Sequence, residues 1–152
     1  METPTLKRLL GAQFGSMQAL SIDHVNLAFP ADRLEEVIEF YVTKLGFDSP
    51  FEDPFTAVTN NPGLFGLTLG PTCRLFVNPT ASFDEPANNF RHVAVALDTT
   101  PAALHEHLAA EDIMIQHEAE RNNDALGAYT SYYVSDPFGY TIELMACDKA
   151  DE

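Results

Sequence analysis

Basic residues are scarce in this chain of 152 residues. Its 8 Lys and Arg are outnumbered by 23 Asp and Glu, and the formal net charge is −15. Nucleic acids and anionic membranes are bound through clusters of basic side chains. We therefore expect neither of them as a partner. Scattered acidic residues are typical of an ordinary acidic cytosolic protein and equally of a protein adapted to high salt.

Cysteine and long apolar runs are also rare. The two cysteines, Cys73 and Cys147, are an isolated pair, without the spacing of a zinc site or of a disulfide scaffold. No apolar run has the length of a membrane span, and no secretory signal peptide is recognisable. These absences predict a cytoplasmic protein. Hydrophobic residues still make up 45% of the chain, which is enough for a core.

Two histidines occupy matching places in two half-chain repeats. His24 and His92 lie 68 residues apart, and each begins a segment of alternating apolar residues, which is typical of a half-buried strand. A helical pattern follows in each half: residues 31–45, ended by Gly46, and a helix capped by Thr100. Further strands are predicted near residues 47–51, 64–69 and 72–78, and near 113–119, 130–134 and 140–146.

Each half therefore has the predicted order β-α-β-β-β. A half of this size cannot bury its own sheet face, so we expect the two to share one concave surface in an α+β fold. The predicted divisions are an N-terminal extension (1–18), module 1 (19–78), a linker (79–89), module 2 (90–147) and a tail (148–152).

A carboxylate joins the two histidines as a candidate site residue. Glu143 lies within an apolar strand pattern, where an unpaired acid is costly to bury. Two imidazoles and one carboxylate suit Fe(II) or Mn(II), with Zn(II) and Ni(II) as further options. We predict a divalent-metal site at His24, His92 and Glu143. The alternative is that both histidines are hydrogen-bonded core residues and that Glu143 lies on a solvated face.

His117 and Tyr133 are the candidate catalytic residues. His117 follows Ile115 at strand spacing, and it would face inward as an acid or base. Tyr133 would offer a hydroxyl from the next strand. Ordinary strand packing is the alternative for both. The loop at residues 121–129 is either a lid over the cavity or a plain loop.

Four segments carry a family resemblance: residues 23–25, 40–47, 91–93 and 136–144. In this order they resemble the vicinal oxygen chelate superfamily, which includes glyoxalases, bleomycin and fosfomycin resistance proteins, and extradiol dioxygenases. The resemblance covers residues 19–147 and implies two βαβββ modules that form a half-open barrel around a divalent metal. It implies His24, His92 and Glu143 as the metal ligands. The fourth ligand position of glyoxalase I-type members aligns with Leu75.

The resemblance also implies a function. We expect a metal-dependent enzyme that chelates neighbouring oxygens of a small substrate. An extradiol-dioxygenase-like oxygenase is preferred, because no fourth ligand is found. A glyoxalase-type lyase or isomerase, or a fosfomycin-resistance-type transferase, is the alternative among enzymes. A metal-free protein that sequesters a cationic drug, as bleomycin resistance proteins do, is the alternative outside them. Small members commonly form homodimers, and we expect one here, with a metal site inside one chain or between two.

Overall fold

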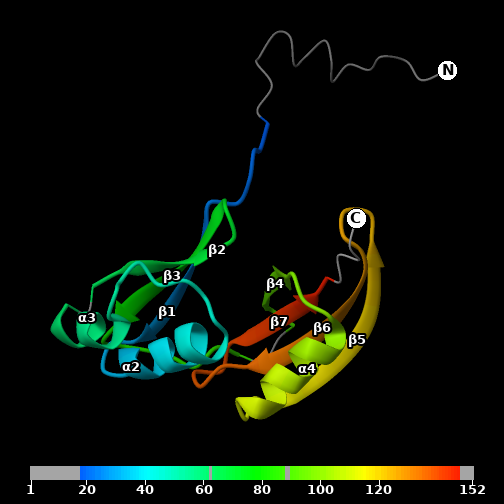
Figure 1. The fold of residues 1–152 in the computed structure, drawn as a ribbon. Coiled ribbons are helices and arrows are strands. Elements are labelled where there is room, and N and C mark those ends of the chain that lie inside the picture. The colour runs from blue at the N-terminus through cyan, green and yellow to red at the C-terminus, as the bar shows by residue number, and fades with distance from the viewer. Residues whose placement is uncertain (1–17, 62, 88–89, 148–152) are drawn as a thin grey trace, which may run out of the picture.

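The computed structural model describes residues 18–61, 63–87 and 90–147. The predicted tail at 148–152 and nearly all of the predicted N-terminal extension lie outside these residues. The described residues form two separate open sheets flanked by helices, which confirms the predicted α+β class. Figure 1 shows the sheets as two lobes, β1 to β3 in one and β4 to β7 in the other. Within the described ranges, no helix is long and apolar enough to cross a membrane.

The first half contains a sheet of strand order β1-β3-β2. β1 (His24–Pro30) pairs in parallel with β3 (Cys73–Thr80), which pairs antiparallel with β2 (Phe65–Leu69). Gly46 ends the helical region as predicted, with a φ of 76° that favours glycine. The helical segments of this half are α2 (Leu34–Val37), the π-helical η1 (Ile38–Lys44) and α3 (Pro54–Asn60).

One predicted strand of the first half is reduced to a single bridge. The pattern predicts a strand near residues 47–51, but only Asp48 pairs there, with Thr68 of β2. The chain then enters α3, which the sequence analysis did not predict. The side chain of Asp53 caps this helix by accepting from the backbone N–H of Thr56, and Pro54 occupies its first turn. These residue types are a helix-start signal, and they take the chain away from the sheet edge.

The second half follows the predicted β-α-β-β-β order. Its sheet has the strand order β4-β7-β6-β5. Thr100 caps the helix as predicted, since its side chain accepts from the backbone N–H of Ala103. The hairpin of β5 and β6 takes up most of residues 121–129, where a lid or a loop was expected. The elements are β4 (Val93–Leu97), α4 (Pro101–Ala110), β5 (Ile115–Asn123), β6 (Gly127–Ser135) and β7 (Thr141–Ala146).

Helices cover one face of each sheet and build the hydrophobic core. In the first half, Leu75 and Val77 of β3 are buried together with Ile38 of η1. In the second half, Ile142 of β7 is buried together with Leu108 of α4. Because side chains alternate along a strand, the neighbouring residues point to the opposite face. That opposite face carries the predicted site residues.

A buried hydrogen bond joins the two halves. The Tyr41 hydroxyl in η1 donates to Oδ2 of Asp136 over 2.6 Å, and Oδ1 of Asp136 accepts from the backbone N–H groups of Phe138 and Tyr140. Tyr140 in turn donates its hydroxyl to the carbonyl oxygen of Ala28 in β1. Burial raises the pKa of Asp136, while its hydrogen bonds oppose that rise. This contact fixes where β7 begins relative to the first half.

Candidate functional site

Glu143 and His92 are in direct contact on the second sheet. Glu143 is only 6% exposed, and its Oε2 lies 2.9 Å from Nε2 of His92, the residue before β4. Its Oε1 accepts a hydrogen bond from the hydroxyl of Ser131 in β6. The other ring nitrogen of His92, Nδ1, lies 2.9 Å from the carbonyl oxygen of Phe90. Glu143 is therefore a buried and fully partnered acid rather than a residue of a solvated face.

The partner of Nδ1 determines what the opposite nitrogen of His92 can do. A carbonyl oxygen only accepts, so Nδ1 carries the proton of a neutral imidazole. The lone pair at Nε2 then faces a carboxylate oxygen of Glu143 at 2.9 Å. Two acceptors at this distance repel each other unless a second proton or a metal cation lies between them. Metal-binding histidines typically donate their other N–H to a carbonyl or carboxylate in this way, so this donor set fits a divalent cation.

The predicted catalytic residues share a row of the sheet with Glu143. Glu143 is in register with Tyr133, and Tyr133 with His117. The Tyr133 ring meets the rings of both histidines, with centroid distances of 5.5 Å to His92 and 5.6 Å to His117. Directly paired residues point to the same face of a sheet. The two candidate catalytic side chains therefore lie on the face that carries the His92–Glu143 pair.

A β-bulge brings His117 to this row. The register of β5 against β6 shifts between Ile115 and His117, so Ile115 pairs with the buried core residue Val134. Strict alternation predicts that Ile115 and His117 lie on the same face of the strand. This prediction was wrong for Ile115, which lies on the core face. The extra residue, Gln116, reverses the phase of the strand. Nothing in the alternation pattern reveals such an insertion.

His24 begins β1 on the other sheet, where it has its own set of contacts. Its Nδ1 lies 2.7 Å from Oδ2 of Asp23, and Oδ1 of Asp23 lies 3.5 Å from the guanidinium of Arg74. The hydrogen bond from His24 lowers the pKa of Asp23, and the positive charge of Arg74 adds to this. The His24 ring is stacked on Phe76, with 4.1 Å between the ring centroids. As in His92, an acceptor holds Nδ1 and leaves Nε2 for a ligand.

The strand registers identify the residue of the first half that corresponds to Glu143. Asn26 and Ala94 each follow their histidine by two positions. Asn26 pairs with Phe76, and Ala94 pairs with Glu143. The counterpart of Glu143 is therefore Phe76, and the alignment with Leu75 was one residue off. No carboxylate stands at either position.

The three predicted ligands are divided between the two sheets. His92 and Glu143 are in contact, whereas His24 stands on β1 with different neighbours. Over residues 18–61, 63–87 and 90–147, no group of three or more His, Cys, Asp or Glu side chains is gathered so that it could hold a metal ion. The part of the single chain that is described thus brings together two of the three, and the role of His24 as a ligand stays a prediction.

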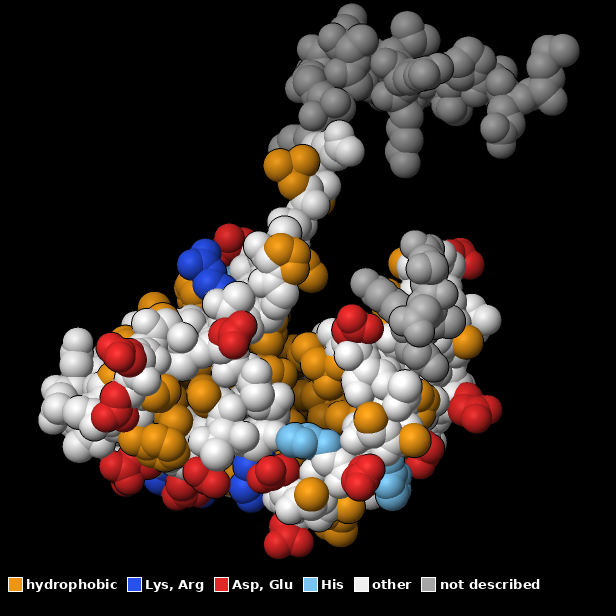
Figure 2. Space-filling model, in the orientation of Figure 1, with side chains coloured by type: hydrophobic (Ala, Val, Ile, Leu, Met, Phe, Trp, Pro, Cys, Tyr) orange, Lys and Arg blue, Asp and Glu red, His pale blue; other side chains and the backbone are white. Residues whose placement is uncertain are grey.

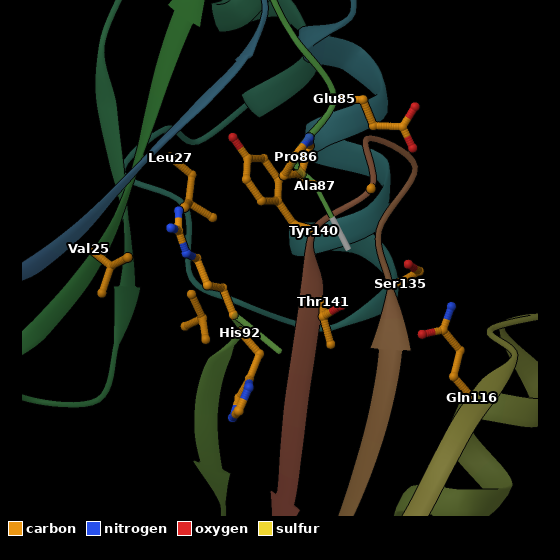
Figure 3. A pocket seen from close by; sticks show the side chains of 13 residues that line it. Val25, Leu27, Glu85, Pro86, Ala87, His92, Gln116, Ser135, Tyr140 and Thr141 are labelled. Carbon is orange, nitrogen blue, oxygen red and sulfur yellow. The ribbon is translucent and has the colours of Figure 1, made fainter. Parts of the chain in front are cut away.

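A pocket of about 620 Å³ lies beside His92 (Figure 3). Val25 and Leu27 of β1 form an apolar side, and the second sheet contributes polar groups. Ser135 and Thr141 are in register with each other and lie one row from Glu143 and Tyr133. Neither residue was singled out from the sequence. The volume suits a small organic molecule.

A second hollow of about 630 Å³ separates the two halves and is mainly apolar. Figure 2 shows hydrophobic side chains gathered in it, between the two lobes. β1 and β4 are edge strands of their sheets. Both strands contribute to its lining, with Val25 from one and Val93, Val95 and Leu97 from the other.

Comparisons with known proteins agree with this fold. The sequence matches the family described as Glyoxalase/Bleomycin resistance protein/Dioxygenase superfamily over residues 21–144. A comparison with curated proteins found no match.

Three solved structures illustrate the similarity. An integron cassette protein from the mobile metagenome of V. cholerae is 25% identical, with a TM-score of 0.63 over 86% of this chain and 98% of that one. A glyoxalase family protein from Bacillus anthracis is 23% identical, with a TM-score of 0.63 over 88% and 99%. A glyoxalase/dioxygenase from Nostoc punctiforme is 18% identical, with a TM-score of 0.60 over 88% and 100%. The family match over residues 21–144 means that this chain belongs to the glyoxalase/bleomycin resistance protein/dioxygenase superfamily.

Proposed function

We propose that this protein is a divalent-metal-dependent enzyme that binds a small substrate through two neighbouring oxygens, and that its activity is that of an oxygenase. The observation that carries the proposal is the contact between His92 and Glu143. A buried carboxylate oxygen and an imidazole nitrogen lie 2.9 Å apart there, and each group is held from behind, the carboxylate by Ser131 and the imidazole by the Phe90 carbonyl. Such support from neighbouring groups is typical of metal ligands.

Two histidines and one carboxylate leave coordination positions open for substrate. Fe(II) is the preferred metal and Mn(II) the next, while Zn(II) and Ni(II) also accept these ligands. When bound, such a metal acts as a Lewis acid toward the substrate oxygens and lowers their pKa. Phe76 at the place of a fourth ligand supports an oxygenase over a glyoxalase I-type lyase. The lyase, isomerase or transferase activity remains the second candidate.

His117 would act as the acid or base of the reaction, and Tyr133 would act as a hydrogen-bond donor. Both side chains share the sheet face of Glu143, so a substrate held at His92 and Glu143 would lie within their reach. His117 is exposed and would exchange a proton with the substrate or with solvent. The Tyr133 hydroxyl would donate a hydrogen bond to a substrate oxygen. We expect His117→Asn and Tyr133→Phe to lower turnover while the metal content stays unchanged.

We also propose that the third ligand, His24, comes from a second copy of the chain in a homodimer. His24 and the His92–Glu143 pair lie on different sheets, and each sheet has an edge strand, β1 or β4, beside the apolar hollow. A second copy would cover this hollow and bring His24 of one chain to His92 and Glu143 of the other. Apolar surface of this kind favours association when it is buried.

Metal content is the first test. The protein would be purified anaerobically without added metal or chelator, and its metals would be measured by elemental mass spectrometry. Near-stoichiometric iron supports the oxygenase and directs substrate screening to compounds with adjacent oxygens in the presence of dioxygen. Manganese, nickel or zinc supports the lyase or transferase. A protein that contains no metal and takes none up on titration would refute the proposal and favour sequestration of a cationic ligand.

A mixing experiment tests the shared site. His24→Ala and Glu143→Ala chains would each bind no metal alone, and they would be unfolded together and refolded as mixed dimers. If the site spans two chains, each mixed dimer has one site free of substitutions, and metal binding returns to about half of the wild-type stoichiometry among these dimers. If the site lies within one chain, every site carries a substitution and no binding returns. Mixing His92→Ala with Glu143→Ala is the control, because no arrangement restores that pair.

A further inference from the structure

We propose that Phe76 and Gly66 are positioning residues for His24. The ring of Phe76 sets the plane of the imidazole, and Gly66 provides the space in which this ring lies. This inference rests on the proposed function, in which His24 is a metal ligand. Its carrying observation is the stack of His24 on Phe76, with 4.1 Å between the ring centroids and 11° between the ring planes.

His24 needs such support because little else restrains it. Its side chain is 41% exposed, and it is the first residue of its strand. A side chain in this situation is free to change rotamer, and restricting it costs conformational entropy. The Asp23 carboxylate holds one edge of the ring, at Nδ1. The flat contact with Phe76 then fixes the plane, so that together the two neighbours define the direction of Nε2.

Gly66 makes room for the Phe76 ring. Gly66 of β2 is in register with Phe76 of β3. A Cβ atom at position 66 would lie 3.0 Å from both Cδ1 and Cε1 of Phe76, and 3.4 Å from Cδ of Arg74. The ring therefore lies over the glycine backbone. A glycine inside a strand weakens it and often marks a close approach of this kind, which explains its presence here.

The second half shows what the glycine replaces. Glu143, the counterpart of Phe76, is in register with Tyr133, so Tyr133 is the counterpart of Gly66. In the second half, the carboxylate of Glu143 lies beside the histidine, and the aromatic ring of Tyr133 lies on the neighbouring strand. In the first half the aromatic ring stands beside the histidine and the neighbouring strand has no side chain. In the first half, an aromatic ring supported by Gly66 therefore stands at the position that Glu143, a predicted ligand, has in the second half.

Arg74 closes this set of contacts. Its guanidinium carbon lies 5.6 Å from the centre of the Phe76 ring, and its Nη2 lies 3.5 Å from Asp23. Arg74 is therefore near both supports of His24. Since Asp23 and Arg74 are exposed and exposed ion pairs contribute little, we expect the ring stack to be the stronger restraint.

The first test reads the orientation of His24 in metal-free protein. Ring-proton NMR shifts of His24 report the stack, because a flat aromatic neighbour moves them upfield. We expect Phe76→Leu and Gly66→Ala to remove most of this shift. Phe76→Tyr, which keeps a flat ring, should retain it. Thr68→Ala is the matched control, since Thr68 is an exposed residue on the same face of β2. Wild-type His24 shifts in Phe76→Leu would overturn the proposal.

The second test links the stack to metal binding. Titration with Mn²⁺ should give about tenfold weaker affinity for Phe76→Leu and Gly66→Ala, in line with the loss of other supports of metal ligands. Affinity should be unchanged in Phe76→Tyr and Thr68→Ala. Altered His24 shifts with wild-type Mn²⁺ affinity would overturn the claim that the stack serves the metal. If the wild-type protein binds neither Mn²⁺ nor anaerobic Fe²⁺, the proposed function fails, and the NMR result alone decides whether Phe76 positions His24.

Discussion

His24 stacks on Phe76 at the register position where, in the second half, His92 contacts Glu143. The two halves therefore repeat one backbone arrangement with different chemistry. In the second half, a buried carboxylate faces the imidazole. In the first half, an aromatic ring supports the imidazole and brings no charge. The same arrangement of strands thus carries an asymmetric set of side chains, with two of the predicted ligands on one sheet and the third, His24, on the other.

The carboxylate of Glu143 is predicted to be needed for metal binding and not for folding. In Glu143→Gln, an amide N–H can donate to Nε2 of His92, and the amide oxygen can still accept from Ser131. We expect a folded protein whose metal affinity is at least tenfold lower. Calorimetric titration with Mn²⁺ and thermal unfolding would measure both quantities. Glu118→Gln, at an exposed acid of β5, controls for the change of net charge. Wild-type affinity in Glu143→Gln would contradict the assignment.

Ser131 is predicted to support Glu143. Ser131 is fully buried and donates to Oε1 of the carboxylate, so Ser131→Ala leaves a buried acceptor unpaired. We expect the free energy of unfolding to fall by about 1–3 kcal/mol and the metal affinity to fall by about 10-fold or more. Urea unfolding and metal titration check these effects. Thr130→Ala removes a hydroxyl from the other face of β6 and should leave metal affinity unchanged, and equal losses in both variants would argue against the specific role.

The Tyr41–Asp136 hydrogen bond is predicted to stabilise the protein in a pH-dependent manner. Burial raises the pKa of Asp136 and the Tyr41 hydrogen bond lowers it. When folding raises the pKa of a carboxyl, the folded protein loses stability as the pH rises from the unfolded pKa of that group through its folded pKa. Tyr41→Phe raises that pKa further, so the loss in stability should be larger at about pH 7, where the unfolded carboxyl is ionised, than at about pH 3, where both states are protonated.

Urea unfolding of Tyr41→Phe at both pH values checks this prediction, with an expected loss of about 1–3 kcal/mol at neutral pH. Tyr140→Phe is the matched control, because its hydroxyl donates to the neutral carbonyl of Ala28. The loss in free energy of unfolding caused by Tyr140→Phe should change little between the two pH values. A pH-independent effect of Tyr41→Phe would show that Asp136 does not carry the dependence.

The cap of α4 is predicted to contribute to stability alone. The Thr100 hydroxyl oxygen accepts from the backbone N–H of Ala103 over 3.1 Å. Thr100→Ala should lower the free energy of unfolding by about 1 kcal/mol. Thermal or urea unfolding measures this loss, and metal content measured on the same sample should stay at the wild-type level. A loss of metal in this variant would contradict the prediction that the cap contributes to stability alone.

Local patterns in the sequence predicted most elements of the fold. Alternating residues identified β1 and β4, and Thr100 and Gly46 marked a helix start and a helix end. These signals are local, because capping, φ preference and side-chain alternation depend on a few neighbouring residues. The strand expected near residues 47–51 was wrong beyond Asp48, since its pairing depends on a partner strand rather than on its own pattern.

The sequence by itself determined the family, the α+β class and the residues His24, His92 and Glu143 as candidates, because repeated local patterns and residue types are sufficient for these. Only the tertiary structure decided which of them meet. The contact of His92 with Glu143, the bulge that turns His117 toward them and the register that sets Phe76 beside His24 all depend on pairing between distant strands. A shift of one residue in such a pairing reverses the face of every side chain, and no local pattern specifies it.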